Sequence, residues 1–339
     1  MNKEIGGYFE LELRYGSHYH PDAIRLNSAR HAFEYVLQAN NYRKVYIPYF
    51  TCEVMLQPIH RLGVEVEYYH IDQQLEPNVL PTLAADEAFV YTNYFGLKQA
   101  YVECLSQHYR HGLIIDNSQA FFAPHVDGID TFYSARKFLG VADGAYLYTN
   151  KILDIDIPQD KSFSRMQHLL QRIDEGASAA YSIFHKNDES LSRQPILRMS
   201  ALTERILCSI DYDAIRFRRQ ENFRCLDHHL SSSNLLQFTP SPSAVPMAYP
   251  YLTADPTLRQ RLISNKIFVA TYWPNVLNWC TTNDLEYQFT QNIIPLPIDQ
   301  RYNAQDMKTI AEFTPHHNTL INNVLFVSRC NYSLFLIAA

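Results

Sequence analysis

The chain has 339 residues, a formal net charge of −6 and 47% hydrophobic residues. It is longer than the roughly 100–200 residues of one domain, so we expect one large domain and a smaller one. The composition is typical of a soluble globular protein. No lysine- and arginine-rich run stands out, which argues against nucleic acid or an anionic membrane as a partner.

The six cysteines are spread along the chain without a pair at CxxC spacing. This pattern indicates neither a disulfide framework nor a zinc site. The first thirteen residues lack the apolar core of a signal peptide, and no apolar run approaches the ~20 residues of a membrane span. We therefore expect free thiols and a cytoplasmic location.

Strand and helix signals alternate over the first part of the chain. Asn27 and Ser28 are good N-cap residues in front of a helical apolar pattern that reaches Leu37. The following segments predict strands at 45–48, 64–69, 88–96 and 113–116, and helices at 51–62 and 97–110. This alternation is typical of βαβ units and predicts a largely parallel sheet.

The character of the chain changes at residue 152, where a mostly helical insert begins. A second α/β unit follows, with helices expected at 219–230, 257–265 and 303–313, strands at 245–252 and 267–271, and an extended piece at 293–298. We therefore divide the chain into a large domain, residues 1–215 with the insert at 152–215, and a small domain, residues 216–339. The apolar stretch 324–339 is expected to pack against another surface.

One stretch, Leu113–Tyr148, concentrates polar side chains at the ends of short apolar runs. Asp116 closes one run, Ser134 closes the next, Lys137 follows, and Gly144 opens the last. An acid, a hydroxyl, an amine and a glycine at strand ends are typical of a ligand site at the rim of an α/β sheet.

These residue types suit pyridoxal phosphate (PLP). That cofactor needs a lysine for covalent attachment, a carboxylate beside its pyridine nitrogen and donors for its phosphate. Asp116 would keep the nitrogen protonated through charge pairing and a hydrogen bond. The sequence therefore predicts a PLP site centred on Lys137.

On these residues the chain resembles the DegT/StrS-type sugar aminotransferases, a family of fold-type I PLP-dependent enzymes. Asp116–Ala123 resembles the family's Asp-x-Ala-Gln block, and Ser134–Ala145 resembles its lysine block. The resemblance continues, in order, through Asn27–Leu37, Ile47–Met55, Asn93–Gly96, Leu262–Pro274 and Ile293–Met307. It spans nearly the whole chain except the helical insert and the tail.

The resemblance implies a three-layer α/β/α large domain with a mostly parallel sheet, a smaller C-terminal α/β domain, and a homodimer. It implies that Lys137 attaches the cofactor, that Asp116 meets the pyridine nitrogen, and that Gln119 lies beside the ring. The phosphate would be held by Ser28, Ala29 and Arg30, which stand at the family's phosphate-binding positions, and by Ser134. Ser134 resembles the Ser-x-x-Lys of other fold-type I aminotransferases, because the family's own serine lies five residues before the lysine, where this chain has Phe132.

Several positions depart from the family's pattern. The family's Ser-Gly-Thr is Ser28-Ala29-Arg30 in this chain, which places a cation at the phosphate position. The aromatic residue that stacks on the cofactor ring aligns with Cys52, so Tyr94 or Phe50 would have to supply the stacking ring. These departures affect the cofactor's phosphate and ring more than the lysine and the acid.

The hypothesis from the sequence is a PLP-dependent aminotransferase that moves an amino group, with glutamate as the expected donor, to a sugar-like ketone that is nucleotide-linked. Two alternatives stay open: another PLP-dependent reaction on a sugar, and a non-catalytic or regulatory descendant of the fold. Three histidine pairs, at 18/20, 228/229 and 316/317, lack companion ligands at metal-binding spacing and are interpreted as incidental.

Overall fold

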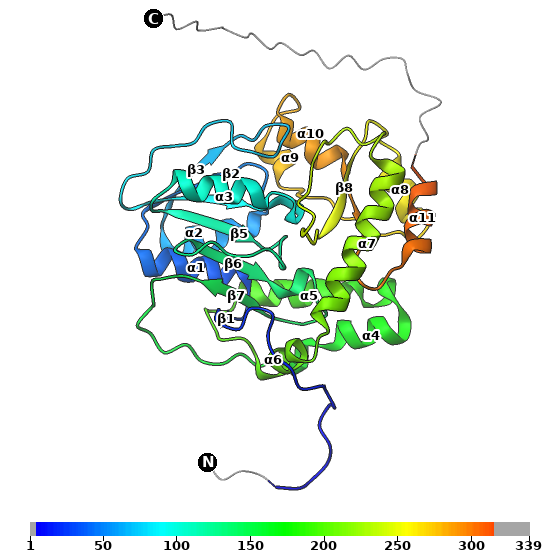
Figure 1. Cartoon of the computed structure of the whole chain (residues 1–339). Helices are drawn as coiled ribbons and strands as arrows, with labels where there is room; N and C mark the ends of the chain where they lie inside the picture. The colour runs from blue at the N-terminus through cyan, green and yellow to red at the C-terminus, as the bar shows by residue number, and fades with distance from the viewer. Residues whose placement is uncertain (1–4, 315–339) are drawn as a thin grey trace, which may run out of the picture.

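A computed structural model describes residues 5–314 of the chain. Figure 1 shows two bodies side by side: a seven-stranded sheet covered by helices, and a smaller unit formed by the later part of the chain. The prediction of a large and a small α/β unit is confirmed in its architecture. The apolar stretch 324–339 lies outside the described residues.

The large sheet has the strand order β1-β7-β6-β5-β4-β2-β3. Five strands, from β6 through β3 in that order, run parallel, and β7 lies antiparallel between β6 and β1. The strands are β1 (Ile24–Leu26), β2 (Lys44–Pro48), β3 (Glu65–Tyr69), β4 (Glu87–Thr92), β5 (Leu113–Asn117), β6 (Asp130–Ser134) and β7 (Ala145–Tyr148). The expected mostly parallel sheet is therefore present.

Helices cover both faces of this sheet, which makes the expected three layers. One apolar cluster joins α1 (Ala29–Asn40) and α2 (Leu56–Leu62) to one face. A second cluster joins α3 (Gln99–His108) and α6 (Ala201–Cys208) to the other face. The helical insert also contains α4 (Gln167–Glu175) and α5 (Ala177–Ser192), which pack against each other.

The smaller unit is built on the antiparallel pair β8 (Ala248–Leu252) and β9 (Ile293–Pro297). Its own apolar cluster lies between this pair and the helices α7, α8 and α11. The helices of the unit are α7 (Tyr212–Leu230), α8 (Leu258–Ser264), α9 (Val276–Trp279), α10 (Leu285–Asn292) and α11 (Ala304–Glu312). The sequence patterns did not predict α9 and α10.

The structure corrects several predicted elements. The strand predicted at 88–96 ends at Thr92 and is followed by a 3₁₀ turn, Tyr94–Gly96. The strand at 267–271 is wrong: that segment is irregular, with Phe268 51% exposed. Its carbonyl at Ala270 accepts a hydrogen bond from Arg259, so a side chain satisfies backbone that a neighbouring strand would otherwise pair. The helix at 51–62 is shorter, a 3₁₀ turn Glu53–Met55 followed by α2. The division at residue 215 falls inside α7, which begins at Tyr212.

Within residues 5–314, no helix is both long enough and apolar enough to cross a membrane. The five cysteines of this range are free thiols.

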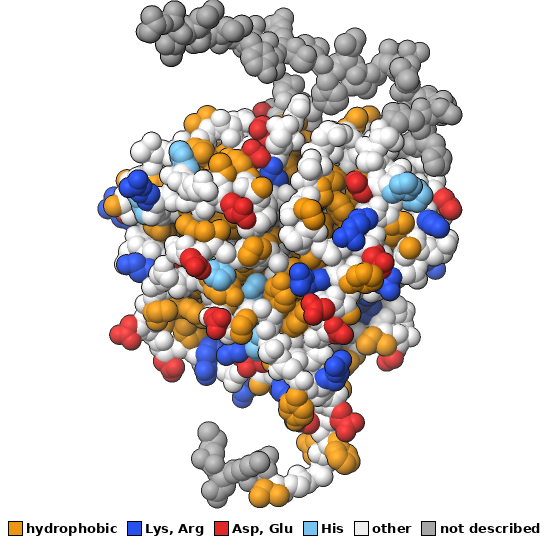
Figure 2. All heavy atoms as spheres, viewed as in Figure 1, with side chains coloured by type: hydrophobic (Ala, Val, Ile, Leu, Met, Phe, Trp, Pro, Cys, Tyr) orange, Lys and Arg blue, Asp and Glu red, His pale blue; other side chains and the backbone are white. Residues whose placement is uncertain are grey.

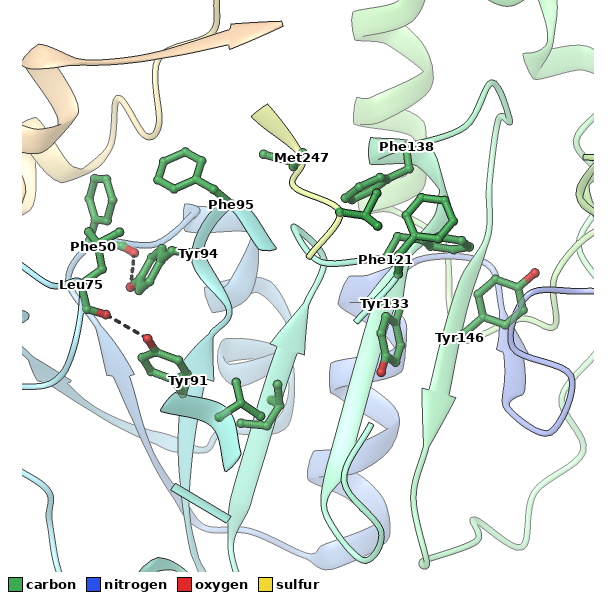
Figure 3. Close-up of a cluster of buried hydrophobic side chains, with 14 of the residues drawn as sticks. Phe50, Leu75, Tyr91, Tyr94, Phe95, Phe121, Tyr133, Phe138, Tyr146 and Met247 are labelled. Carbon is green, nitrogen blue, oxygen red and sulfur yellow. Dashed lines mark hydrogen bonds between the residues drawn. The ribbon is translucent and has the colours of Figure 1, made fainter. Parts of the chain in front are cut away.

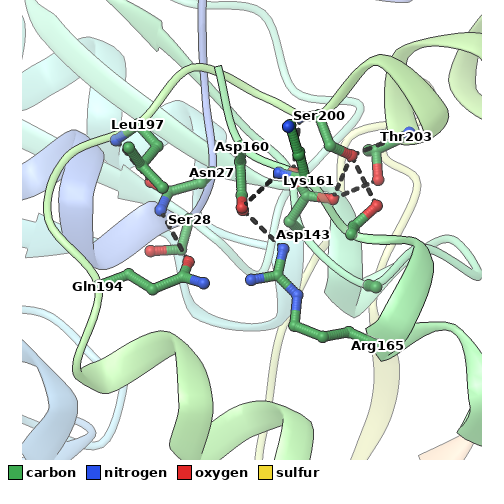
Figure 4. Close-up of polar contacts among 12 residues, drawn as sticks. Asn27, Ser28, Asp143, Asp160, Lys161, Arg165, Gln194, Leu197, Ser200 and Thr203 are labelled. Carbon is green, nitrogen blue, oxygen red and sulfur yellow. Dashed lines mark hydrogen bonds and ion pairs between the residues drawn. The ribbon is translucent and has the colours of Figure 1, made fainter. Parts of the chain in front are cut away.

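A buried carboxylate fastens the start of β7 to α6. Asp143, which is fully buried, accepts hydrogen bonds from the backbone N–H of Ser200 (2.8 Å), from the Ser200 hydroxyl (2.8 Å) and from the Thr203 hydroxyl. Ser200 also caps α6 by accepting from the N–H of Thr203. Figure 4 shows this network beside Asn27 and Gln194. It holds the turn that leads from Lys137 into β7.

Substitution Ser200→Ala should lower the free energy of unfolding by about 2 kcal/mol, because it removes a helix cap and leaves part of a buried carboxylate without a donor. Denaturant titration measures this loss. The matched control is Ser106→Ala, whose hydroxyl makes only a solvent-exposed bond to Glu103 and whose loss should change stability by at most about 0.5 kcal/mol. Equal stabilities of the two variants would contradict the role given to Asp143.

Candidate functional site

The carboxyl ends of the parallel strands meet at one edge of the large sheet, and the predicted site residues lie there. Asp116 near the end of β5 stands opposite Thr92 of β4 and Phe132 of β6. Ser134 is the last residue of β6. Because β7 runs antiparallel, its first residues also reach this edge, and Ala145 stands opposite Ser134. The fold thus brings together residues from three strands, as the sequence predicted.

Lys137 ends the short 3₁₀ turn Ala135–Lys137 that directly follows β6. Its side chain is exposed and makes no hydrogen bond or ion pair within residues 5–314. Its charge acts on Cys52: burial, the larger effect, raises the pKa of that thiol, and the positive charge of Lys137 opposes the rise. The amine therefore lies free at the sheet edge, close enough to Cys52 to influence its ionisation.

Asp116 and Gln119 are both buried, and each keeps one polar atom open. One oxygen of Asp116 accepts from the N–H of Ser118 at 2.8 Å, and no other hydrogen bond to this carboxylate occurs in the described part of the chain. The carbonyl oxygen of the Gln119 side chain accepts from the N–H of Phe95 at 2.7 Å. Its amide nitrogen is buried without a partner among the described residues. Buried polar atoms without partners are rare and indicate a missing ligand or water.

Ser134 and Gly144 complete this side of the site. The hydroxyl of Ser134, which is buried, makes no hydrogen bond within residues 5–314. Gly144 has a φ of +118°, which favours glycine, and a Cβ there would lie 3.1 Å from a methyl of Thr203. The backbone N–H of Gly144, just before β7, donates to the carbonyl of Asn27, the residue before the N-cap of α1, at 2.7 Å.

The predicted phosphate position lies at the N-terminus of α1. Ser28 is its N-cap, as predicted: its side chain accepts from the N–H of His31, and its oxygen lies 2.8 Å from Nδ1 of the His31 ring. Ala29 begins the helix and is partly exposed. Arg30 is only 8% exposed and donates to the side chain of Gln57 on α2 at 2.8 Å. Burial lowers the pKa of Arg30. Its guanidinium is thus engaged with α2.

The candidates for ring stacking lie in different surroundings. Tyr94 has no exposed surface, and its hydroxyl donates to the carbonyl of Phe50 at 2.9 Å, as Figure 3 shows. Phe50 is likewise fully buried, 5.0 Å from the Trp273 ring. Neither ring has a face open to a ligand in this structure, whereas Cys52 is partly exposed. Both aromatic rings therefore act as core, and their stacking role stays a prediction.

The helical insert contributes residues that the sequence patterns did not single out. On α5, Asp188 pairs with Arg136 at 2.9 Å, and the amide of Asn187 donates to the carbonyl of Ala142 at 3.1 Å. The charge of Arg136 helps to hold the pKa of Asp188 below its usual value, although burial opposes this effect. Helix α5 therefore contacts the chain before and after Lys137, at Arg136 and at Ala142. Only the adjacency of Arg136 to Lys137 in sequence could have signalled this.

The residues present fit PLP at most positions. Lys137 offers a free amine, Asp116 an oxygen without a donor, Gln119 a buried amide nitrogen without an acceptor, and Ser134 a free hydroxyl. These are the groups that the covalent bond, the pyridine nitrogen, the ring substituents and the phosphate require. Arg30 fits least, since its side chain donates to Gln57.

The overall architecture, a mostly parallel seven-stranded sheet with a small second unit, is shared with several solved structures. The chain is similar to the sugar aminotransferase CalS13 from Micromonospora echinospora, with 13% identity, a TM-score of 0.58, and 86% of each chain covered. It is also similar to a DegT DnrJ EryC1 StrS aminotransferase from Brucella abortus (13% identity, TM-score 0.58, 86% of this chain and 84% of that chain) and to DesV from S. venezuelae (14%, 0.58, 86% and 83%). These likenesses establish the fold. No protein-family profile and no curated protein sequence matches the chain.

Stability should fall as the pH drops from about 6.5 to about 4, partly because of His31. Burial, followed by the charge of Arg30, lowers the pKa of His31 from 6.5 to about 4. In this pH window the unfolded chain binds the proton and the folded protein does not, so each pH unit costs up to about 1.4 kcal/mol of unfolding free energy. Above pH 6.5 both states are neutral and the effect vanishes.

Denaturant titrations between pH 7.5 and 4.5 measure how the unfolding free energy depends on pH. His31→Gln should make this dependence shallower by up to the contribution of one bound proton, about 1.4 kcal/mol per pH unit. His20, whose pKa burial also lowers to about 4, remains in that variant and keeps part of the slope. Parallel curves for the wild type and His31→Gln would show that His31 is not neutral in the folded protein at these pH values.

Proposed function

We propose that the protein is a PLP-dependent aminotransferase. It would take an amino group from an amino acid, with glutamate as the first candidate, and transfer it to the keto group of a nucleotide-linked sugar. The observation that carries the proposal is the free amine of Lys137 at the sheet edge that also holds the half-satisfied carboxylate of Asp116.

The comparisons support the same choice. CalS13 is named a sugar aminotransferase, and Spr1654 from Streptococcus pneumoniae, at 14% identity and a TM-score of 0.57, is known in a PLP form and a PMP form. The chain covers at least 83% of these proteins, so the fold that carries their site is matched over most of its length.

PLP, when bound, supplies an electron-accepting ring. Asp116 would hold a proton at the ring nitrogen, because its carboxylate is buried and a buried charge strongly favours a hydrogen-bonded cationic partner. The Gln119 amide would donate to an oxygen of the ring. Lys137 would act as base and acid: its amine would accept a proton from the substrate carbon and then deliver it to a carbon of the cofactor.

Phosphate binding would use the free hydroxyl of Ser134 and the backbone N–H groups at Ser28, Ala29 and Arg30, where the helix dipole of α1 favours an anion. Arg30 would contribute by its charge, since its side chain already binds Gln57. The small-molecule substrates would approach from the exposed side of Lys137.

We further propose a homodimer. The insert helices α4 and α5 carry Leu170, Ile173 and Tyr181 with 58%, 81% and 64% of their surfaces exposed, and the arm of residues 5–15 has exposed hydrophobic side chains that Figure 2 shows. Apolar surface of this extent is typical of a site that another protein covers.

A non-catalytic descendant of the fold is the second candidate. Two observations favour it. The side chain of Arg30, which would otherwise bind the phosphate, donates to Gln57. Tyr94 and Phe50 are both fully buried, so neither ring is available to stack on the cofactor. This candidate predicts a protein that takes up no cofactor.

When the protein is incubated with PLP and reduced with borohydride, the cofactor should become attached to Lys137, because that amine is free and exposed. Peptide mass spectrometry locates the adduct. Lys137→Ala should abolish it, and Lys186→Ala, which removes an exposed lysine of α5, should leave it intact. If the Lys137→Ala protein still formed a reducible cofactor adduct in the same pocket, the assignment of Lys137 would be wrong.

Substitution Asp116→Asn should keep cofactor attachment but slow amino transfer by about 10²–10³-fold, because a neutral amide cannot stabilise the protonated ring nitrogen. Single-turnover absorbance changes with an amino donor measure the rate. The matched control is Asp127→Asn, a fully exposed acid in the loop after β5, which should react at the wild-type rate. Equal rates in both variants would remove Asp116 from the mechanism.

A further inference from the structure

Arg219 of α7 is buried with 2% of its surface exposed and has no carboxylate in an ion pair within residues 5–314. The negative charge of Asp299 acts on Arg219 through space, but the Asp299 carboxylate forms its ion pair with Arg301. Burial lowers the pKa of Arg219 to about 10, so the guanidinium is charged at neutral pH. A buried cation without an acidic partner is costly unless hydrogen bonds satisfy all its donors.

The donors of Arg219 reach into three segments. Its Nε donates to the side chain of Gln300 at 3.0 Å, and one terminal nitrogen donates to the carbonyls of Pro246 (3.3 Å) and Met247 (3.1 Å). The other terminal nitrogen lies 3.4 Å from the carbonyl oxygen of Phe138, and the guanidinium stands 4.5 Å from the centre of the Phe138 ring. The small unit therefore contacts the residue next to Lys137.

Gln300 strengthens this contact. Its side-chain amide donates to the same carbonyl of Phe138 at 2.8 Å while its oxygen accepts from Arg219. We call Arg219, Gln300 and the Phe138 carbonyl the Phe138 clamp. Both donors come from the small unit, and the acceptor belongs to the turn that presents Lys137.

The same guanidinium also connects to the other side of the site. Met247, whose carbonyl binds Arg219, donates its N–H to the carbonyl of Phe95 at 2.8 Å. The N–H of Phe95 in turn donates to the side chain of Gln119 at 2.7 Å. Figure 3 shows Met247 between Phe95 and Phe138. One buried cation thus links, through backbone, the Lys137 turn and Gln119.

We propose that Arg219 and Gln300 are positioning residues that fix the Lys137 turn and Gln119 relative to each other and couple both to the small unit. The functional part of this inference rests on the proposed function, in which Lys137 carries the cofactor. A movement of the small unit would shift the Lys137 amine through the Phe138 carbonyl, because no other polar contact holds that carbonyl within the described residues.

Gln300→Glu separates positioning from folding. The carboxylate still accepts from Arg219, and pairs with its charge, but it has no N–H for the Phe138 carbonyl. Hydrogen exchange of the full chain without cofactor is the first measurement, at the Phe138 and Leu139 amides that bond to Ala135. Their exchange should accelerate about two- to tenfold, the factor that one ordinary hydrogen bond supplies.

The second measurement is the pH dependence of Lys137 acetylation by trace acetic anhydride, followed by peptide mass spectrometry. Gln300→Leu removes the same donor without adding a charge, so it should change this profile together with Gln300→Glu if Gln300 positions the turn, whereas an effect of the added charge alone would appear only in Gln300→Glu. The matched control is Gln305→Glu on the exposed face of α11, which adds the same charge to the same unit. If Gln300→Glu does not fold, Gln300→Leu also removes the donor, and the same two readouts decide.

Exchange rates and acetylation profiles of the Gln300 variants that match Gln305→Glu would overturn the proposal. Both readouts use protein without cofactor, so they remain decisive if the wild type fails to bind PLP. Failure to bind PLP would instead refute the proposed function, while the two readouts would still decide whether the Phe138 clamp positions the Lys137 turn.

Discussion

The site depends on a carboxylate that the fold buries and only half satisfies. Asp116 is 6% exposed at the end of a central strand, with one hydrogen bond from the backbone two residues on. Burial of a charge with an open oxygen is unfavourable unless a cationic or hydrogen-bonding partner completes it. The amine of Lys137 and the amide nitrogen of Gln119 also lack partners among the described residues at this sheet edge. A single ligand that binds all three groups would offset the free-energy cost of burying Asp116.

The surrounding structure keeps this edge rigid. Asp143 fastens the start of β7 to α6, α5 holds Arg136 and Ala142, and Arg219 and Gln300 hold Phe138. The Lys137 turn is therefore restrained from three directions while its amine stays free. Such an arrangement is expected of a preorganised reactive group, which needs fixed backbone and an accessible side chain.

Sequence reasoning predicted the sheet edge because its signals are local. Asp116 and Ser134 each close a short apolar run, Lys137 follows three residues after Ser134, and parallel strands bring such ends together. It could not predict Asp188 or Arg219, because their partners lie 52 and 81 residues away and only tertiary packing joins them. The false strand at 267–271 has a related cause: an apolar run is equally compatible with an irregular segment whose backbone a distant arginine satisfies.

The most direct test of the central claim is the visible absorption spectrum of the purified protein with PLP, before and after glutamate or another amino donor is added. We expect a visible band that bleaches when a donor is added and returns with a keto acid. A protein that shows no visible band with PLP, and therefore no response to donors, would contradict it.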